Sequence, residues 1–381
     1  MLKKVITAVV LIMGFISGIS AGGVAESKTK AGKTWPDCSL RGLCVGLPRI
    51  TMTEEKTWER LKEWNVNVIT INFTYDKHLA DMPDSSTLSQ VSPEMEPYRC
   101  MLDRLDKIIV LAKRYNTFIV LEGGAAVGSD KINVAQHDIV ESTENAERAY
   151  LKNVIDLHMY LGKKYANEPA VLAYNFISEP HTPWIVKNWQ TEVVPSFIKA
   201  IRSVDKNTFL IFSAGLWGFP EFFDTLTPFQ DPVNKTLYGF HDYAPHNYTH
   251  QGIVNRPRGL EYPGILKMFD SRKSKFWDRK TLYEYMKPAI DFKKKYNVKM
   301  YVGEFGVVRW APGRAQWVED MCSLFEENKI DWTFHSYTGW NGWNLTFPAD
   351  AKESNEPDGR VETERLKVLK KYWMKNYIAP R

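Results

Sequence analysis

Two glutamates in this chain stand where a charged side chain is costly. Glu179 follows the mostly apolar segment Ala-Tyr-Asn-Phe-Ile at 173–177, and Glu304 follows the apolar residues 300–302 within a Gly-Glu-Phe-Gly sequence. Apolar runs of this kind are typical of buried parallel strands, and a carboxylate at their ends needs a partner or a function. Hydrolysis of a glycosidic bond requires two such groups, one that donates a proton and one that attacks carbon or activates water. The pair therefore predicts this chemistry if the fold brings both strand ends together.

The elements that would position these acids alternate along the chain. Eight segments rich in Val, Ile, Tyr and Phe are mostly apolar throughout, which favours a sheet covered on both faces. They are residues 42–47, 66–73, 117–122, 171–177, 209–214, 237–243, 299–303 and 331–336. Apolar residues at helical spacing lie between them, for example at Tyr150, Val154, Leu157, Leu161 and Tyr165. This alternation predicts an α/β fold, a single (β/α)8 TIM barrel.

Connection lengths indicate which face of the barrel carries the site. Segments that lead from helices into strands are short, whereas 74–99, 123–143, 244–279 and 337–360, which leave strands, are long. Active sites of such barrels lie at the carboxyl-terminal face of the strands, where these long loops would be. Both glutamates belong to that face, after the fourth and seventh strands. A structural ion pair is the plainer interpretation of a single glutamate, but two acids in this register favour catalysis.

The motifs around the acids resemble glycoside hydrolase family 5, the cellulase and mannanase group of retaining (β/α)8 enzymes. Ser-Glu-Pro at 178–180 is similar to the Asn-Glu-Pro of the family's acid/base, and Gly-Glu-Phe-Gly at 303–306 to the setting of its nucleophile. His-Asp-Tyr at 241–243 matches a His-x-Tyr element after the family's sixth strand. The resemblance covers nearly all of the chain in strand order, although its motifs are short.

This resemblance implies roles for four residues. Glu179 would be the acid/base and Glu304 the nucleophile. Tyr243 would hydrogen-bond the nucleophile, and His241 would line the site.

Four positions depart from the family pattern. Ser178 replaces the asparagine that holds the sugar 2-hydroxyl, and Thr70 stands in the second strand where an arginine near the nucleophile is usual. Glu122 ends the third strand where a histidine is common nearby, and His335 takes the place of a sugar-stacking tryptophan. Two outcomes are open: Glu122 or a water replaces the contact to the 2-hydroxyl, which we favour, or the enzyme is slow or prefers a sugar altered at C2. The sugar and the linkage stay open.

Tryptophans in the predicted exit loops are candidate sugar platforms, because flat rings suit the apolar faces of pyranoses. Trp340 and Trp343, after the final strand, are the strongest candidates, and Trp217 is another. Trp184 and Trp310 lie in similar loops. Packing in the core is the alternative for each of them.

The amino-terminal segment predicts export. Lys3 and Lys4 precede an apolar run over 5–20 and then small residues, which is the order of a secretory signal. A membrane anchor is the weaker alternative, because the run is short and interrupted by glycine. We expect a signal peptide at 1–25 and a glycoside hydrolase domain at 26–381, in a secreted or periplasmic protein.

Composition narrows the remaining classes. The 381 residues, 44% of them hydrophobic, suffice for one large core, and the net charge of +5 is modest and spread out, which argues against nucleic acid as a partner. His241, His246 and His250 could suggest a metal site, but no pattern of carboxylate ligands accompanies them. We therefore expect no metal and no cofactor. Four cysteines in an exported chain favour one or two disulfides, with Cys38–Cys44 the most local pair.

The sequence thus predicts a secreted, monomeric, retaining glycoside hydrolase that acts on a β-linked oligo- or polysaccharide of glucan or mannan type. It would use two glutamates in a double displacement. A non-catalytic glycan-binding barrel is the alternative that Ser178, Thr70 and His335 motivate, and a transglycosylase on the same fold is a third. A bond-cleavage assay, with and without an acceptor sugar, distinguishes the three.

Overall fold

The computed structural model describes residues 33–45, 50–73, 99–123, 143–253, 255–269, 273–337, 340–352 and 361–377. The predicted signal peptide at 1–25 lies outside these residues, as do the exit segments 74–98 and 124–142. Within the described part of the chain, no helix combines the length and the apolar character that crossing a membrane requires.

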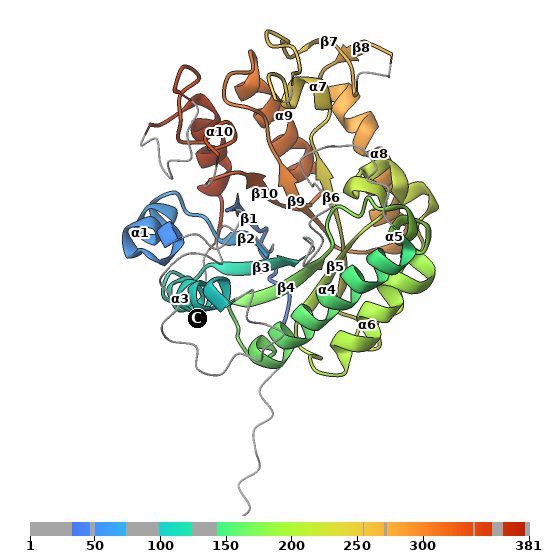
Figure 1. Cartoon of the computed structure of the whole chain (residues 1–381). Coiled ribbons are helices and arrows are strands. Elements are labelled where there is room, and N and C mark those ends of the chain that lie inside the picture. Colours follow the sequence, from blue (N-terminus) through green and yellow to red (C-terminus); the bar gives the residue numbers. More distant parts are fainter. Residues whose placement is uncertain are drawn as a thin grey trace, which may run out of the picture. The chain divides into compact units, whose positions relative to one another are not determined.

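Eight parallel strands close into a barrel in the order β1, β10, β9, β6, β5, β4, β3, β2, and β2 pairs again with β1 (Figure 1). They are β1 (Arg41–Cys44), β2 (Val68–Phe73), β3 (Phe118–Gly123), β4 (Val171–Phe176), β5 (Phe209–Ser213), β6 (Thr236–Asp242), β9 (Met300–Phe305) and β10 (Asp331–His335). Each predicted strand segment overlaps one of these strands. The (β/α)8 barrel that the sequence predicts is therefore confirmed.

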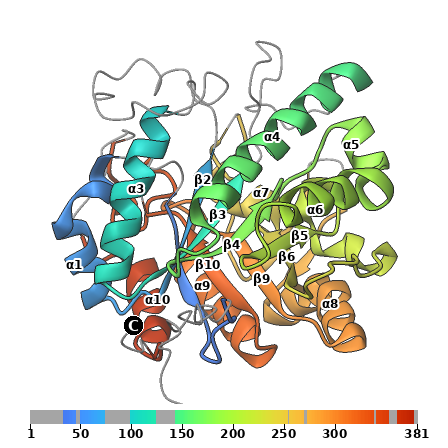
Figure 2. The same ribbon diagram turned by 90° about the horizontal axis from the view of Figure 1, so that it is seen from below.

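Helices surround the strands, as Figure 2 shows. The longer ones are α1 (Glu55–Glu63), α3 (Arg99–Arg114), α4 (Glu144–Tyr165), α6 (Val194–Arg202), α8 (Arg279–Tyr296), α9 (Arg314–Glu327) and α10 (Glu364–Trp373). Side chains cap several of them: Thr143 begins α4, Asp278 begins α8 and Thr363 begins α10, each accepting a backbone N–H. In α4, Val154, Leu157, Leu161 and Tyr165 are buried, which is the apolar face that the helical spacing predicted.

Asparagines make the turns at the amino-terminal end of the barrel short. Asn65, Asn116 and Asn297 follow α1, α3 and α8 with φ of 59°, 53° and 51°, the left-handed conformation that ends a helix abruptly. Asparagine adopts this conformation more readily than other side chains except glycine. These turns explain why the two faces of the barrel differ so much in loop length.

The barrel interior is filled in layers. Near the amino-terminal end, Trp35 and Leu40 pack with Val68, Val120 and Tyr301 from the strands. The next layer is polar: the Thr70 hydroxyl lies 2.6 Å from Tyr301 Oη and 2.9 Å from Thr333 Oγ1. The layer above it holds the candidate site.

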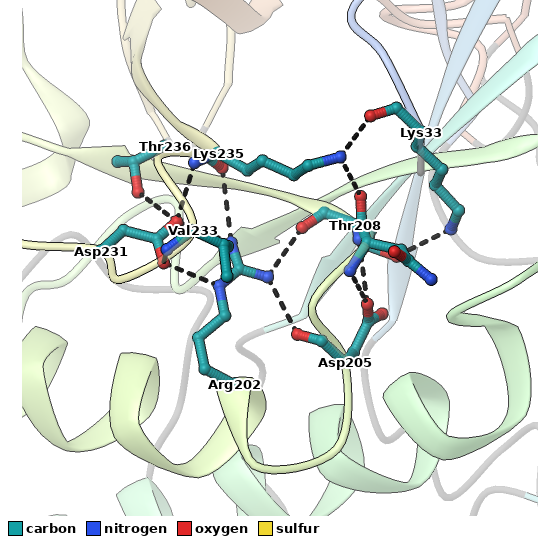
Figure 3. Close-up of polar contacts among 9 residues, drawn as sticks. Lys33, Arg202, Asp205, Thr208, Asp231, Val233, Lys235 and Thr236 are labelled. Atoms are coloured by element: carbon teal, nitrogen blue, oxygen red, sulfur yellow. Dashed lines mark hydrogen bonds and ion pairs between the residues drawn. The ribbon is translucent and has the colours of Figure 1, made fainter. Parts of the chain in front are cut away.

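Charged side chains close the amino-terminal end of the barrel (Figure 3). Arg202 at the end of α6 is buried and binds Asp231 through two hydrogen bonds of 2.8 Å. Its remaining donors reach the carbonyl oxygens of Asp205 at 3.0 Å and Thr208 at 2.8 Å. Asp231 also accepts from the backbone N–H of Lys235 at 3.0 Å. Every polar atom of this ion pair thus has a partner.

Lys33 joins this network from the amino-terminal segment. Its ammonium donates to the carbonyl oxygens of Tyr165 at 2.9 Å and Val171 at 2.7 Å, and to Thr208 Oγ1 at 2.7 Å. Burial lowers the pKa of Lys33 to about 8, although Asp205 opposes the shift.

A short hairpin inside the connection from β6 to α8 was not predicted. It consists of β7 (Gly264–Leu266) and β8 (Lys275–Trp277), which pair antiparallel. Three-residue strands carry too little alternation to stand out in a sequence.

Candidate active site

Side chains from seven strands of the barrel, and from the residues that follow them, meet at its carboxyl-terminal mouth. On β6 and β9, His241 and Glu304 are register partners, and Tyr243 follows β6 directly. Asn72, Glu122 and Asn175 form one row across β2, β3 and β4. Cys44 and His335 are register partners on β1 and β10. Glu179 comes from the segment just after β4.

Glu304 is held by three neighbouring groups. The Tyr243 hydroxyl donates to its Oε2 at 2.7 Å, and Asn72 Nδ2 donates to its Oε1 at 3.1 Å. The Cys44 thiol lies 3.6 Å from the same Oε1. These contacts fix the orientation of the carboxylate.

The electrostatic surroundings keep Glu304 ionised. Burial raises the pKa of this carboxyl, but positive charge on His335 and His241 and the hydrogen bonds from Tyr243 and Asn72 outweigh it. The result is a pKa of about 2. A buried carboxylate that stays charged at ordinary pH is suited to act as a nucleophile.

Glu179 and Glu304 meet at one imidazole nitrogen. His241 Nδ1 lies 2.8 Å from Glu179 Oε1 and 3.8 Å from Glu304 Oε2. The sum of these distances is an upper limit on the separation of the two oxygens, and it admits the roughly 5 Å of retaining glycosidases. The side chain of Glu179 is 38% exposed and that of Glu304 is 11% exposed. One acid is thus open to solvent and the other is enclosed.

His241 is surrounded by carboxylates. Burial lowers the pKa of this imidazole, but the charge of Glu304 and the contacts with Glu122 and Glu179 raise it well above the ordinary value. The ring is therefore an imidazolium that faces three acids. Likewise, burial and the charges of Glu304 and Glu179 raise the pKa of Tyr243 well above its usual value, so Tyr243 stays a hydrogen-bond donor.

Glu122 occupies the floor of the mouth. Asn175 Nδ2 donates to Glu122 Oε2 at 2.6 Å, and the same oxygen lies 3.7 Å from His241 Nε2. Gly303 on β9 leaves room for these groups. A Cβ there would lie 3.0 Å from the His241 ring and 3.2 Å from both Asn175 and Glu122. Any residue larger than glycine at position 303 would therefore crowd His241, Asn175 and Glu122.

Backbone strain marks the segment that carries Glu179. Ile177 has φ of 38°, a conformation that is costly for a β-branched residue. Trp217, with φ of 55°, donates its backbone N–H to the Pro180 carbonyl at 2.9 Å. The Trp217 ring stacks on His181 at 4.3 Å, and His181 Nδ1 lies 2.8 Å from the Glu179 carbonyl. Ser178 lies half-buried within this braced turn.

Of the predicted sugar platforms, Trp343 contacts Tyr243, which binds Glu304. Its ring centroid is 5.6 Å from that of Tyr243, 5.5 Å from His335 and 4.7 Å from His250. Trp340 instead contacts Trp310 edge-on at 5.7 Å. Trp184, which is buried beneath the Arg148 guanidinium, belongs to the helical shell.

Three polar residues of the mouth were missed by sequence reasoning. Asn72, rather than Thr70, is the β2 residue that reaches Glu304. Thr70 lies two positions earlier on β2, in the barrel layer below the mouth. The position that corresponds to a residue near the nucleophile is therefore Asn72, and the comparison of Thr70 with the family arginine was misplaced. Asn175 and Cys44 were also missed, although a single polar residue near the end of an apolar strand is the signal that could have found them.

Cys38 and Cys44, the most local candidate pair, form no disulfide in the structure. Both residues are thiols in the structure. Cys44 ends β1 with its sulfur 3.5 Å from Asn72 Oδ1, inside the mouth. Its side chain is therefore directed toward the candidate site and away from a cross-link.

Two groups of side chains at the mouth have metal-ligand chemistry. They are Glu122, His241 and Glu304, and Cys44, Glu304 and His335, and the ligand atoms within each group lie within 4.8 Å of one another. The histidine set that the sequence suggested is different, because His246 and His250 stack on each other at 3.8 Å. In the first group the imidazolium of His241 offers no lone pair while it faces the acids.

A closed (β/α)8 barrel with acids at the carboxyl ends of its strands has the architecture of barrel enzymes. The profile of the cellulases, glycosyl hydrolase family 5, matches residues 27–363. The chain therefore belongs to glycosyl hydrolase family 5, and it is a glycosidase that hydrolyses O-glycosyl bonds.

Individual relatives agree with this assignment. The chain is 28% identical to endoglucanase C of Acetivibrio thermocellus over 289 residues, which cover 70% of this chain and 79% of that protein. It is 22% identical to cellodextrinase A of Ruminococcus flavefaciens over 232 residues, which cover 60% and 65%. The structure of Thermotoga maritima Cel5A with cellobiose matches at 17% identity and a TM-score of 0.64, covering 87% of this chain and 97% of that one. The predicted family resemblance is confirmed.

Proposed function

We propose that this protein is a retaining hydrolase of β-linked glucans. The observation that carries the proposal is the meeting of two glutamates of unequal environment at His241 Nδ1. Glu304 is enclosed and ionised, as a nucleophile must be, whereas Glu179 is open to solvent, as a group that exchanges protons with a leaving group and water must be.

In the first step, Glu304 attacks the anomeric carbon while Glu179 donates its proton to the departing glycosidic oxygen. A covalent glycosyl ester on Glu304 and a free alcohol result. In the second step, the Glu179 carboxylate removes a proton from water, and the hydroxide oxygen displaces the ester to restore the Glu304 carboxylate. Tyr243 and Asn72 hold Glu304 in line during both steps.

The substrate class follows from the relatives. The similar proteins include endoglucanases and a cellodextrinase, and Cel5A of Thermotoga maritima has been solved with cellobiose and with mannotriose. We place a β-glucan first and a mannan second. Trp343, beside Tyr243, is the preferred platform for the sugar, with Trp217 near Glu179 as a further one.

Ser178 raises the question of what binds the sugar 2-hydroxyl. We propose that Glu122 and its partner Asn175 take the role of the missing asparagine. A water can bridge them to the 2-hydroxyl if the direct distance is too long for a hydrogen bond. Ser178→Asn therefore should not raise kcat on gluco-configured substrates. A large gain would instead reveal a contact that the wild type lacks.

We also propose that the protein is exported from the cytoplasm. The order of charged, apolar and small residues over 1–25 supports cleavage of a secretory signal, and a polymeric glucan is met outside the cytoplasm. Amino-terminal sequencing of the protein from culture supernatant tests this, with a mature terminus near residue 26 as the expected result.

A cleavage assay tests the proposed function directly. The purified protein is incubated with β-1,4-glucan, β-1,3-glucan and mannan, and new reducing ends are measured. Proton NMR of the first product should show the β-anomer. Glu304→Gln is the control, because it keeps the shape of the side chain. Binding without cleavage would favour the non-catalytic barrel, and longer products with an added acceptor would favour a transglycosylase.

A further inference from the structure

The β7–β8 hairpin borders a cavity that the proposed reaction does not use. The cavity has a volume of about 330 Å³ and is lined by Met268, Lys273, Lys275, Trp277 and Tyr285; we call it the hairpin pocket. This volume is in the lower range of small-ligand sites and suits one or two sugar units. The hairpin leaves the carboxyl end of β6 and lies at the top of Figure 1. It therefore belongs to the face that carries the candidate active site.

The lining of the hairpin pocket combines aromatic rings with positive charge. The rings of Trp277 and Tyr285 are 6.1 Å apart at 64°, and the Lys275 ammonium lies 4.4 Å from the centre of the Trp277 ring. Trp277 is almost fully buried, and among the described residues its indole N–H has no hydrogen-bond partner. An unused donor in a largely apolar wall is costly unless a ligand accepts from it.

No described acidic side chain neutralises the positive charge of the pocket. Lys273 and Lys275 form no ion pair within the described ranges, and no acidic side chain is part of the lining there. Asp278 is the next acid along the chain, but its carboxylate accepts from Thr281 N–H at 2.9 Å and begins α8. The pocket is therefore complementary to an anionic group.

The outer face of the hairpin carries an exposed apolar pair. Ile265 and Phe276 are register partners, with exposed fractions of 74% and 56%. Side chains alternate along β8, so Trp277 faces the protein while Phe276 faces solvent. Phe276 and Ile265 therefore form an apolar feature on the face of the hairpin opposite to Trp277.

A row of rings connects the pocket with the candidate active site. From Tyr243, ring contacts run to His250 at 5.0 Å, from His250 to His246 at 3.8 Å, and from His246 to Phe269 at 4.8 Å. Phe269 is adjacent in sequence to Met268, which lines the pocket. Because His246 and His250 are buried, these rings pack the hairpin connection against the mouth.

We propose that the hairpin pocket binds a uronic acid unit of a glycan, with its carboxylate on Lys273 and Lys275 and its ring against Trp277 and Tyr285. The binding itself is independent of bond cleavage. Only the statement that the bound unit belongs to the glycan being cut rests on the proposed function. Lysine and carboxylate form charge-assisted hydrogen bonds, which are about twice as strong as neutral ones, so charge should dominate the selectivity.

Calorimetric titration of the mature protein tests the proposal, with methyl β-glucuronide, methyl β-glucoside and inorganic phosphate as probes. We expect the glucuronide to bind at least tenfold more tightly than the glucoside and than phosphate. Lys275→Ala should weaken glucuronide binding about tenfold and leave the glucoside unchanged, and Lys273→Ala should act in the same direction. Lys280→Ala is the matched control, because this lysine on α8 is 82% exposed and does not line the pocket.

The same titration separates this site from the catalytic one. Glu304→Gln should bind the glucuronide as tightly as the wild type, whatever its effect on hydrolysis. Equal affinity for glucuronide and glucoside, or for glucuronide and phosphate, would overturn the proposal. So would an equal loss in Lys280→Ala and Lys275→Ala, or a loss of glucuronide binding in Glu304→Gln.

Discussion

Buried charges gather at both ends of this barrel, but their surroundings differ. At the amino-terminal end, Arg202 and Asp231 satisfy each other through two hydrogen bonds, and backbone groups satisfy their remaining atoms. At the mouth, three carboxylates surround one imidazole. His241 Nε2 is buried there, 3.7 Å from Glu122 and beyond hydrogen-bond length.

Structural and functional charges in this fold can therefore be distinguished by whether each buried polar atom has a partner. A buried ion pair whose every atom has a partner maintains the fold, and removing one member leaves the other uncompensated. Carboxylates that share one cation and remain partly open are poised for a ligand, and such perturbed groups cluster at active sites.

Replacing the enclosed acid should produce the largest effect on activity. Glu304→Gln removes the nucleophile but keeps an oxygen that accepts from Tyr243, so we expect kcat to fall by roughly 10⁴-fold or more while the protein still unfolds cooperatively. Steady-state kinetics and circular dichroism check both parts. Activity within tenfold of wild type would show that Glu304 belongs with the structural charges.

Replacing the open acid should produce a loss that depends on the leaving group. Glu179→Ala should reduce kcat/KM on unactivated glycosides by roughly 10²- to 10⁴-fold and on dinitrophenyl glycosides far less, because a good leaving group needs no proton. Azide should partly restore turnover and give a β-glycosyl azide. Equal losses on both substrates without rescue would assign Glu179 a structural role.

At the opposite end, the same loss of charge should affect stability instead. Asp231→Asn leaves the buried Arg202 guanidinium without its counter-charge, so we expect the free energy of unfolding to fall by about 3 kcal/mol. The folded fraction should keep the wild-type kcat. Denaturant unfolding measures the effect, and Asp291→Asn, which alters an exposed pair with Lys287, should change stability by less than about 0.5 kcal/mol. Equal effects of the two variants would contradict the comparison.

Lys33 should make the free energy of unfolding depend on pH. Its pKa is about 8 in the folded protein against 10.5 in the unfolded chain, so the unfolded state binds more protons between these values. Stability due to this group therefore rises as pH increases from about 8 to 10.5, by roughly 3 kcal/mol. Between about pH 8 and pH 10.5, the free energy of unfolding of the wild type should rise by this amount relative to that of Lys33→Met. Parallel stability curves for the two proteins would show that Lys33 does not titrate as a buried group.

The fold could be predicted because its signals are local. Apolar strand segments and the asparagine turns at Asn65, Asn116 and Asn297 repeat along the chain, and connection lengths indicate which face is elaborated. The β7–β8 hairpin escaped because its strands are only three residues long.

Only part of the mouth could be predicted. Glu179, Glu304, His241 and Tyr243 lie in short motifs, and the structure brings all four together. Asn72 and Asn175 have no such motif, because only the register of β2, β3 and β4 makes them neighbours of Glu122. Likewise Cys44 was only a candidate for a disulfide by its spacing, whereas strand direction turns its sulfur toward Glu304.

Covalent trapping tests the central claim most directly. A 2-deoxy-2-fluoro β-cellobioside with a good leaving group should glycosylate the enzyme. Fluorine at C2 slows both steps, but the good leaving group keeps the first step fast enough for the glycosyl-enzyme to accumulate. Intact mass spectrometry should show one added fluorocellobiosyl group, and peptide mapping should place it on Glu304. A label on Glu179 or Glu122 would contradict the account, as would an unlabelled enzyme that releases the α-anomer as its first product.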